Sequence, residues 1–165
     1  MSILTKKSIL VTGGTGSIGT ALVEKAILDK AKLIRVFSND ENGLYELESE
    51  FSNHKNIEYV IGDIQNEEIV NKIVKDIDIV FHVAALKHVD RCEMNPLETI
   101  NVNIIGTKNI ANAAQKENIQ RMIFISTDKA VNPIGVMGAT KLLGEKLVSA
   151  EASEKSNTIF ASVRF

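Results

Sequence analysis

The sequence has a single cysteine, no tryptophan, two prolines and little net charge in its 165 residues. With Cys92 alone, no disulfide can form within the chain, so we expect a reducing compartment such as the cytoplasm. A formal net charge of −2 gives no electrostatic reason to expect binding to nucleic acid or to an anionic membrane surface. No apolar run approaches the roughly 20 residues that a membrane-spanning helix needs, and the first residues lack the pattern of a signal peptide.

Length and composition suit a single domain with a sizeable core. Hydrophobic residues make up 44% of the chain, which is enough apolar material to bury a core at this size. The chain has no internal repeat, no low-complexity tract and no composition shift that would mark an internal boundary. We therefore predict one domain over residues 1–165.

The stretch Thr12–Gly19, with the sequence TGGTGSIG, carries the strongest functional signal. It follows the apolar run Ile9–Val11, typical of a short buried strand, and precedes a segment whose apolar residues recur at helical spacing. A glycine turn between strand and helix is typical of a dinucleotide-binding loop, the alternative being a glycine-rich loop without a ligand. Gly13 permits the tight turn, Gly16 lets the backbone approach a pyrophosphate, and Gly19 lets helix and strand pack closely. The predicted cofactor-binding residues of this turn are Gly13, Thr15, Gly16, Ser17, Ile18 and Gly19.

Short β-type runs alternate with longer helical ones along the whole chain. Strands are predicted at residues 9–11, 33–37, 57–61, 77–83, 122–126 and 159–163, and helices at 21–28, 41–51, 67–74, from Pro96 onward, and at 137–152. The residues expected on the inward face of the helix after Pro96 are Leu97, Ile100, Ile104, Ala111 and Ala114. This alternation predicts an α/β fold with a doubly wound, mostly parallel sheet of about six strands and helices on both faces, a Rossmann fold.

Ligands of such sheets bind beyond the carboxyl ends of the strands. The residues at or just after these ends are Gly13, Ser38, Asp63, Ala84 and Ser126, so we predict one site for them although they are scattered in sequence. Phe37 or Ser38 stands where NAD-specific sites usually have an acid, and Asp40 comes two or three residues later. Because Ser38 and Asn39 can donate to a phosphate, we expect NADP, with NAD as the alternative. Asp63 and Ile64 are expected to contact the adenine, unless Asp63 is only a turn residue.

Several further motifs resemble those of the extended short-chain dehydrogenase/reductases. They are the glycine turn, Gly62-Asp63, HVAALKHV at 82–89, NIIGT at 103–107 and STDKAVNP at 126–133. The runs AALKHV and STDKAVNP resemble the polysaccharide-biosynthesis branch, which includes inverting UDP-N-acetylglucosamine 4,6-dehydratases. The resemblance implies a lyase acting on a UDP-sugar, and a homo-oligomer in the full-length form. In that reaction a hydride leaves sugar carbon 4 for NADP, water is eliminated across carbons 5 and 6, and the hydride returns to carbon 6.

One position departs from the usual short-chain dehydrogenase pattern. The Tyr-x-x-x-Lys pair, in which the lysine lowers the pKa of the phenol, is replaced by Met137 and Lys141. Lys141 can still hold the nicotinamide ribose, whereas a methionine cannot take a proton. The resemblance therefore assigns the dehydration step to Asp128 and Lys129. Without the resemblance, Asp128 would be interpreted as a loop or helix-cap carboxylate.

Other predicted contacts lie on the same rim. They are Lys87 and Thr127 for the substrate, and Ala84, Ala85, Lys87, Asn103, Ser126 and Lys141 for the cofactor. A solvated loop charge is the alternative for Lys87, and a helix-surface residue is the alternative for Asn103. No metal site is predicted.

Members of the resembled branch are longer than this chain, and their C-terminal half supplies most of the sugar-nucleotide pocket. We therefore expect residues 1–165 to be the dinucleotide-binding domain without the C-terminal substrate domain, and an apolar face to be exposed. Two function classes remain open. One is a nucleotide-sugar 4,6-dehydratase, or an epimerase or reductase of the same superfamily. The other is a non-catalytic NADP-binding module, which Met137 favours.

Overall fold

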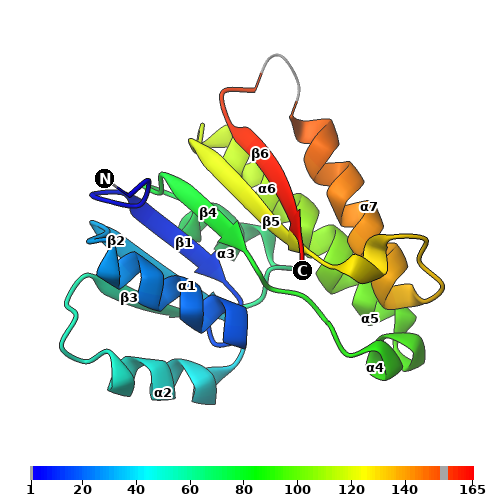
Figure 1. The fold of residues 1–165 in the computed structure, drawn as a ribbon, viewed down its shortest axis with the longest axis horizontal. Helices are drawn as coiled ribbons and strands as arrows, with labels where there is room; N and C mark the ends of the chain where they lie inside the picture. The colour runs from blue at the N-terminus through cyan, green and yellow to red at the C-terminus, as the bar shows by residue number, and fades with distance from the viewer. Residues whose placement is uncertain (1, 153–155) are drawn as a thin grey trace.

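Six parallel strands form one sheet in the part of the chain that the computed structural model describes, residues 2–152 and 156–165 (Figure 1). They are β1 (Ser8–Thr12), β2 (Leu33–Ser38), β3 (Ile57–Ile61), β4 (Ile79–His82), β5 (Arg121–Ser126) and β6 (Ile159–Arg164). The strand order is β3-β2-β1-β4-β5-β6, and each neighbouring pair is parallel. The order therefore reverses between β1 and β4, where doubly wound sheets form their ligand crevice. The predicted α/β fold is confirmed.

Helices connect the strands, and α2 and α3 begin at a side-chain cap. The α-helices are α1 (Ser17–Leu28), α2 (Glu41–Glu50), α3 (Glu67–Ile73), α4 (Val89–Met94), α5 (Pro96–Ile100), α6 (Thr107–Lys116) and α7 (Val136–Glu151). A π-helix, η1 (Asn101–Gly106), joins α5 to α6, and a 3₁₀ turn, η2 (Asp128–Ala130), follows β5. Asp40 accepts a hydrogen bond from the Gly43 N–H, and Asn66 accepts from Glu68 and Ile69. These caps satisfy N–H groups that the first turn leaves free. The sequence did not predict α4 or η2.

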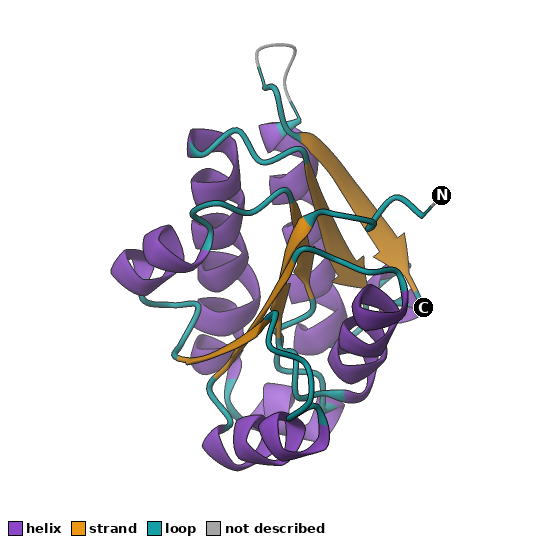
Figure 2. Cartoon of the chain, turned by 90° about the vertical axis from the view of Figure 1, so that its left-hand side faces the viewer, coloured by secondary structure: helices purple, strands orange, loops and turns teal. Residues whose placement is uncertain are grey.

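Helices lie on both faces of the sheet (Figure 2). Apolar side chains form a separate core on each face. On one face α1 and α2 cover β1 and β2, with Val23, Ala26, Leu44 and Leu47 buried. On the other face α3, α6 and α7 cover the central strands, with Val70, Ile110 and Val148 buried. Strands covered on both sides have near-continuous apolar sequences, as in Ile9–Val11, where every residue is fully buried.

One detail of the predicted packing is wrong. Leu97 and Ile100 were expected to face inward with Ala111 and Ala114, but they are 77% and 39% exposed. The helical segment does begin at Pro96, as predicted, but it passes through the π-helix η1. A π-helix closes its hydrogen bonds over five residues instead of four, so side chains fall behind α-helical phase. The face that α6 buries is therefore not the continuation of the Leu97–Ile100 face.

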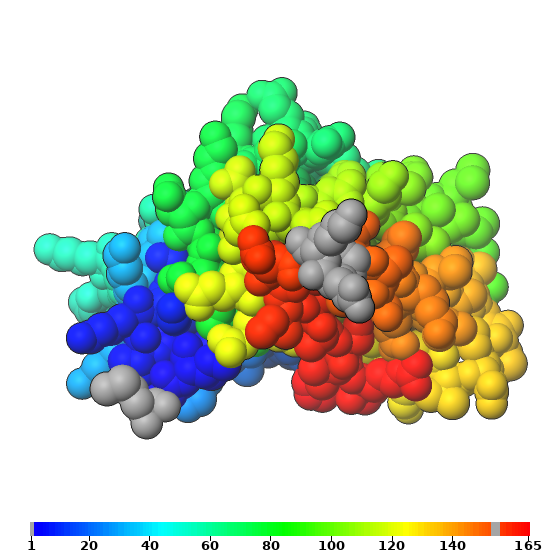
Figure 3. Space-filling model, turned by 90° about the horizontal axis from the view of Figure 1, so that it is seen from above, coloured from blue at the N-terminus to red at the C-terminus, as the bar shows by residue number. Residues whose placement is uncertain are grey.

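Strand β6 is the least covered part of the sheet. It pairs only with β5 among the described residues, and Ile159 and Val163 are 58% and 40% exposed. In Figure 3 its residues, coloured red, lie at the molecular surface. Apolar side chains are thus exposed on this edge strand. Among the described helices, none has the length and apolar content that crossing a bilayer requires.

Candidate active site

The carboxyl ends of the strands open into a cleft with a volume of about 540 Å³. The predicted site residues that line it are Gly13, Thr15, Gly16, Ser17, Ile18, Ser38, Asn39, Asp63, Ile64, Ala84, Ala85, Lys87, Ser126, Thr127, Met137 and Lys141. Gly19, Asn103, Asp128 and Lys129 are not among the residues that line it. Residues that are far apart in the sequence thus line one cleft, as expected.

The glycine turn after β1 has the conformation that its sequence predicts. Gly13 has a φ of +66°, and a Cβ there would lie 2.7 Å from the Ala84 backbone nitrogen. The nearest atom to a Cβ on Gly16 is the Gly13 oxygen at 3.5 Å, so the space in front of Gly16 is open to the cleft. Gly19 packs against the backbone of Gly13 and Gly14, where any side chain would clash. Gly19 thus serves helix packing, and Gly16 leaves room for a bound phosphate.

At the end of β2, the polar groups are already paired with one another. The hydroxyls of Ser38 and Thr15 are 2.9 Å apart, and Ser38 also accepts a hydrogen bond from the Asp40 N–H. The Asp40 carboxylate caps α2 through the Gly43 N–H at 3.1 Å. Arg35 lies elsewhere, donating to Glu58 at 2.7 Å. This corner therefore offers hydroxyl and amide groups, and Asp40 is its acid.

The loop after β3 forms a turn and also lines the cleft. Asp63 accepts a hydrogen bond from the Gln65 N–H at 2.8 Å, so it is a turn residue that also lines the cleft. The Gln65 carboxamide donates to Asp63 and to Glu98, at 3.3 Å and 3.0 Å. Ile64 is buried beside them. Glu98 and Val102, from α5 and η1, also line the cleft and were not predicted, because the phase of that helix could not be anticipated.

Asn103 braces the loop after β4 from behind. It is 1% exposed, accepts from the Leu86 N–H at 2.8 Å and donates to the Leu86 carbonyl at 3.0 Å. It also donates to the Thr140 hydroxyl on α7 at 3.1 Å. The alternative of a helix-surface asparagine is therefore wrong. Leu86 and the exposed Lys87 line the cleft.

Helix α7 brings Met137 and Lys141 to the same wall, as their spacing predicts. Lys141 is 5% exposed, and its Nζ lies 4.1 Å from the centroid of the Phe124 ring. No hydrogen bond from its side chain is found within residues 2–152 and 156–165. Burial lowers the pKa of the Lys141 ammonium to about 8, an effect that the Glu145 carboxylate partly opposes. A buried cation without a hydrogen-bonding partner in a cleft is suited to a polar ligand.

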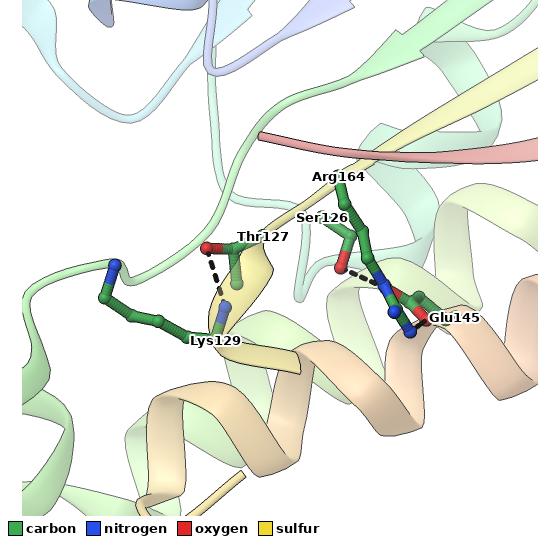
Figure 4. A network of polar contacts seen from close by, with 5 residues as sticks. All are labelled: Ser126, Thr127, Lys129, Glu145 and Arg164. Carbon is green, nitrogen blue, oxygen red and sulfur yellow. Dashed lines mark hydrogen bonds and ion pairs between the residues drawn. The ribbon is translucent and has the colours of Figure 1, made fainter. Parts of the chain in front are cut away.

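The turn after β5 carries the predicted dehydration residues. Thr127 lines the cleft, accepting from the Lys129 N–H at 3.4 Å and donating to Asp128 at 3.0 Å. The Asp128 side chain is 75% exposed, and its pKa is lowered by the Thr127 hydrogen bond and then by Lys129. The Lys129 side chain extends away from Glu145 (Figure 4). Asp128 therefore stands ionised at the rim, outside the cleft of the described residues.

Ser126, Glu145 and Arg164 form a network behind this turn (Figure 4). The Ser126 hydroxyl donates to Glu145, which also accepts from Arg164 Nε and Nη2 at 2.8 Å and 2.6 Å. Arg164, and then Ser126, hold the pKa of Glu145 below its usual range. The network ties β5, β6 and α7 together. Glu145 was not predicted, although it lies one helical turn beyond Lys141.

Comparison with curated proteins finds relatives that are about twice as long. A protein described as an uncharacterized membrane protein of Methanocaldococcus jannaschii is 48% identical over 161 residues. A UDP-glucose 4-epimerase of Rickettsia canadensis is 41% identical over 165 residues. In both cases the match covers 96% of this chain and 48% of the relative. The chain thus spans about half the length of these relatives.

Solved structures share the fold. Pen from Bacillus thuringiensis matches with a TM-score of 0.97 and 41% identity, covering 100% of this chain and 52% of Pen. A UDP-N-acetylglucosamine 4-epimerase from Methanobrevibacter ruminantium, solved with UDP-N-acetylmuramic acid, matches at 0.85 and 28%, covering 97% and 55%. A dTDP-glucose 4,6-dehydratase from Streptomyces venezuelae, solved with NAD, matches at 0.83 and 20%, covering 95% and 55%. The last likeness shows the fold alone.

The glycine turn, the strand order and the cleft agree with a match to one protein family. The model of that family, described as polysaccharide biosynthesis protein, matches residues 9–165, nearly the whole chain. The chain therefore belongs to the polysaccharide biosynthesis protein family, the branch whose motifs its sequence resembles.

Proposed function

We propose that this chain is the dinucleotide-binding domain of a nucleotide-sugar 4,6-dehydratase acting on a UDP-N-acetylglucosamine-like substrate. The observation that carries the proposal is one cleft with a glycine turn at one wall and Lys141 at the other. The space in front of Gly16 suits a pyrophosphate, and the buried Lys141 suits the ribose hydroxyls next to a nicotinamide. When bound, the nicotinamide supplies the acceptor for a hydride from sugar carbon 4.

Met137 moves proton transfer to another group, because oxidation at sugar carbon 4 needs a base for the hydroxyl proton. Its thioether lines the cleft in the place where a tyrosine base is usual, and it can neither give nor take a proton. Proton transfers then fall to the turn after β5. There Asp128 is the acid–base group for the loss of water across carbons 5 and 6, and Lys129 stabilises charge on the departing hydroxyl. Asp128 reaches a sugar only if the substrate extends out of the cleft over η2, where its carboxylate is exposed.

The cofactor of this proposal is NADP. Ser38 and Asn39 line the cleft at the ribose corner and can donate to a phosphate. Asp40, the acid of this corner, already caps α2 through Gly43. This arrangement supports NADP, whereas Asp40 turning toward the ribose would support NAD.

The remaining parts of the proposal concern the whole protein. Residues 1–165 form the dinucleotide domain, and further chain like that of the longer relatives supplies most of the sugar pocket. Lys87, at the exposed rim, is placed to meet the substrate diphosphate, and Thr127 to meet the sugar. The full-length form is a homo-oligomer.

An epimerase of the same superfamily is the second candidate, because a 41% identical relative carries that name. Incubating UDP-N-acetylglucosamine with the protein extended to the length of its relatives separates the two candidates. A product that has lost one water supports a dehydratase, and a product of unchanged mass with an inverted carbon 4 supports an epimerase. If the extended protein binds NADP but leaves every tested UDP-sugar unchanged, a non-catalytic module is the better description.

A further inference from the structure

Three buried polar side chains behind the cleft form one continuous chain of hydrogen bonds that ends at a backbone carbonyl. They are Thr12 at the end of β1, His82 at the end of β4 and Thr107 at the start of α6, each 0% exposed. The carbonyl is that of Asn103 in η1. His82 Nδ1 lies 2.7 Å from the Thr12 hydroxyl, and His82 Nε2 lies 3.0 Å from the Thr107 hydroxyl. The mechanism proposed above uses none of these side chains as an acid, base or ligand.

The groups at the two ends of this series of hydrogen bonds determine which atom donates in each of them. The Thr107 hydroxyl donates its one hydrogen to the Asn103 carbonyl at 2.7 Å, so it can only accept from His82 Nε2. Nε2 therefore carries a hydrogen. At the other end Thr12 accepts from the N–H groups of Val83 and Ala84, at 3.2 Å and 3.3 Å, and donates to Nδ1. The Val83 N–H also donates to the Thr12 backbone carbonyl, at 3.1 Å. The ring is the neutral Nε2–H tautomer.

A protonated ring does not fit this arrangement. A hydrogen on Nδ1 would point at a Thr12 oxygen that already accepts two N–H groups, and the Thr12 hydrogen would lose its acceptor. The groups that face the ring are Thr12, Thr107 and Phe124, which stacks on it at 5.7 Å between centroids, with the Lys141 ammonium over Phe124. Burial, and then the Lys141 charge, lower the pKa of His82 to about 3. The ring stays neutral wherever the domain is folded near neutral pH.

The chain of hydrogen bonds holds one wall of the cleft at both ends. At one end Thr12 binds the backbone at Val83 and Ala84. At the other end Thr107 binds the backbone carbonyl of Asn103, whose side chain binds both backbone groups of Leu86. Between them lies the loop 83–86, every residue of which lines the cleft. The Ala84 backbone packs against Gly13, so the position of this loop also sets the distance to the glycine turn.

We propose that His82 is a positioning residue that joins Thr12 to Thr107 as a neutral Nε2–H imidazole and thereby holds the loop 83–86 in its dinucleotide-binding position. This inference deepens the proposed function, because the loop is taken to contact the dinucleotide. It assigns His82 no contact with substrate or cofactor. Its effect passes through two hydroxyls to the backbone of the cleft wall.

Two variants of His82 separate shape from hydrogen bonding. His82→Phe keeps a planar ring against Phe124 but leaves Thr12 and Thr107 without their partner. His82→Gln keeps one acceptor and one donor at similar spacing. Ile119→Ala is the matched control, because it opens a cavity at a residue 1% exposed at the opposite, amino-terminal end of β5.

The first measurement is amide hydrogen exchange at Ala84 and Leu86, under conditions where each variant is fully folded. Losing hydrogen bonds to buried groups should raise exchange at these amides by about 10-fold or more in His82→Phe relative to Ile119→Ala. His82→Gln should restore most of the protection. Nitrogen NMR of the wild-type ring should show a bare Nδ1 and a protonated Nε2 from neutral pH down to mildly acidic pH.

The second measurement is the affinity of each variant for NADP by calorimetry. We expect His82→Phe to weaken binding by about 10-fold, and His82→Gln and Ile119→Ala to stay close to wild type. The inference is overturned by an Nδ1–H or doubly protonated ring, by unchanged exchange at the amides of Ala84 and Leu86, or by wild-type affinity in folded His82→Phe. If wild type binds neither NADP nor NAD, the proposed function fails, and so does the dinucleotide part of this inference. The exchange and NMR data then still decide whether His82 holds the loop.

Discussion

The two walls of the cleft are made of different chemical groups. The first wall, at the ends of β1 to β3, offers mainly backbone: the turn at Gly13 and Gly16 and the start of α1. The second wall, formed by the loop after β4, the end of β5 and α7, depends on buried side chains. Among them are His82 and Lys141, both with strongly lowered pKa values. Binding of a dinucleotide phosphate needs only N–H groups and space, whereas the chemistry of a sugar needs charges held in place.

This difference predicts which substitutions should impair each wall. A backbone wall is disrupted by any added Cβ and is indifferent to most charge changes. A side-chain wall is sensitive to single-atom replacements and to pH. Variants directed at one wall or the other should therefore fail in different assays.

The largest expected effect is on turnover, at the side-chain wall. In a protein extended to the length of its relatives, Asp128→Asn keeps shape but removes the titrating carboxylate. General acid–base groups contribute roughly 10²- to 10⁴-fold, so the rate of UDP-N-acetylglucosamine dehydration should fall by that factor. NADP affinity should be unchanged, because Asp128 does not line the cleft.

Two matched variants sharpen the assignment. Met137→Ala removes a side chain that holds no proton and should cost little beyond packing. Asp76→Asn makes the same chemical change at an exposed turn before β4, far from the carboxyl ends of the strands. Full activity in Asp128→Asn would refute its role and direct the search to Lys129, Lys141 or a residue beyond this domain.

The next effect is on dinucleotide affinity, at the backbone wall. Gly16→Val places methyl groups in the open space in front of the turn and keeps a pyrophosphate from the N–H groups. Losing two or more hydrogen bonds to a charged group should weaken NADP binding at least about 100-fold by calorimetry. The fold should survive, because the nearest atom to the new Cβ is 3.5 Å away. Ala21→Val, at an exposed position of α1, is the control and should bind normally. Equal affinity in Gly16→Val and wild type would remove the turn from the site.

A third prediction uses the buried charge of Lys141. Its pKa falls from 10.5 to about 8, so between these pH values the unfolded chain binds more protons than the folded one. The free energy of unfolding therefore rises with pH in this window, by up to about 3 kcal/mol from this group. Lys141→Met should raise the free energy of unfolding at pH 7 by about 1–3 kcal/mol and remove this part of the rise.

Urea denaturation at pH 7 and pH 10.5 measures both changes. Lys146→Met, an exposed change on the same helix, should stay within about 0.5 kcal/mol of wild type. A Lys141→Met protein no more stable than Lys146→Met at pH 7 would show that the ammonium is not penalised by burial. The stabilised variant should bind NADP more weakly, since it has lost the cation of the second wall.

The smallest expected effect concerns cofactor choice at the edge of the backbone wall. Ser38→Asp introduces a carboxylate that repels the phosphate of NADP and can accept from ribose hydroxyls, so the preference should move toward NAD by about 10-fold. Ser38→Ala, which removes only the hydroxyl, should lower NADP affinity less. Titrating both dinucleotides decides the point, and tighter NAD binding by the wild type would contradict the NADP assignment.

The backbone wall could be predicted from sequence because its requirements are local. Position 13 has a left-handed φ, and position 16 must lack a Cβ to leave room for a ligand. Glycine meets both requirements, and both glycines lie within the eight residues Thr12–Gly19. The placement of Ser38, Asp63 and Ala84 followed from the position of strand ends in a parallel sheet. Apolar runs were sufficient to find these strands: β2 and β4 are largely buried, and the edge strand β3 is also rich in β-branched residues.

The side-chain wall was only partly predictable, because its contacts join distant segments. The helical spacing of Met137 and Lys141 was enough to place them together. The roles of His82 and Asn103 depend on partners such as Thr12, 70 residues from His82, and no local pattern reveals them. The sequence did not predict that Glu98 lines the cleft, and it wrongly predicted that Leu97 is buried. Both errors arose because the π-helix η1 changes which side chains of the helical segment share a face.

The π-helix has a consequence for which sequence changes this domain can accept. Each side chain in η1 that faces solvent can be replaced without altering the path of the backbone. Deleting one of its solvent-facing residues is also tolerated in principle, because a π turn is an α-helical turn with one residue more and then closes as α-helix. Ile110, Ala113 and Ala114 would keep their places in the core. A deletion at the start of α6 is different, because it rotates the residues after it by about 100° and takes them out of the core. We therefore expect the length of η1 to vary by one residue more readily than the length of α6.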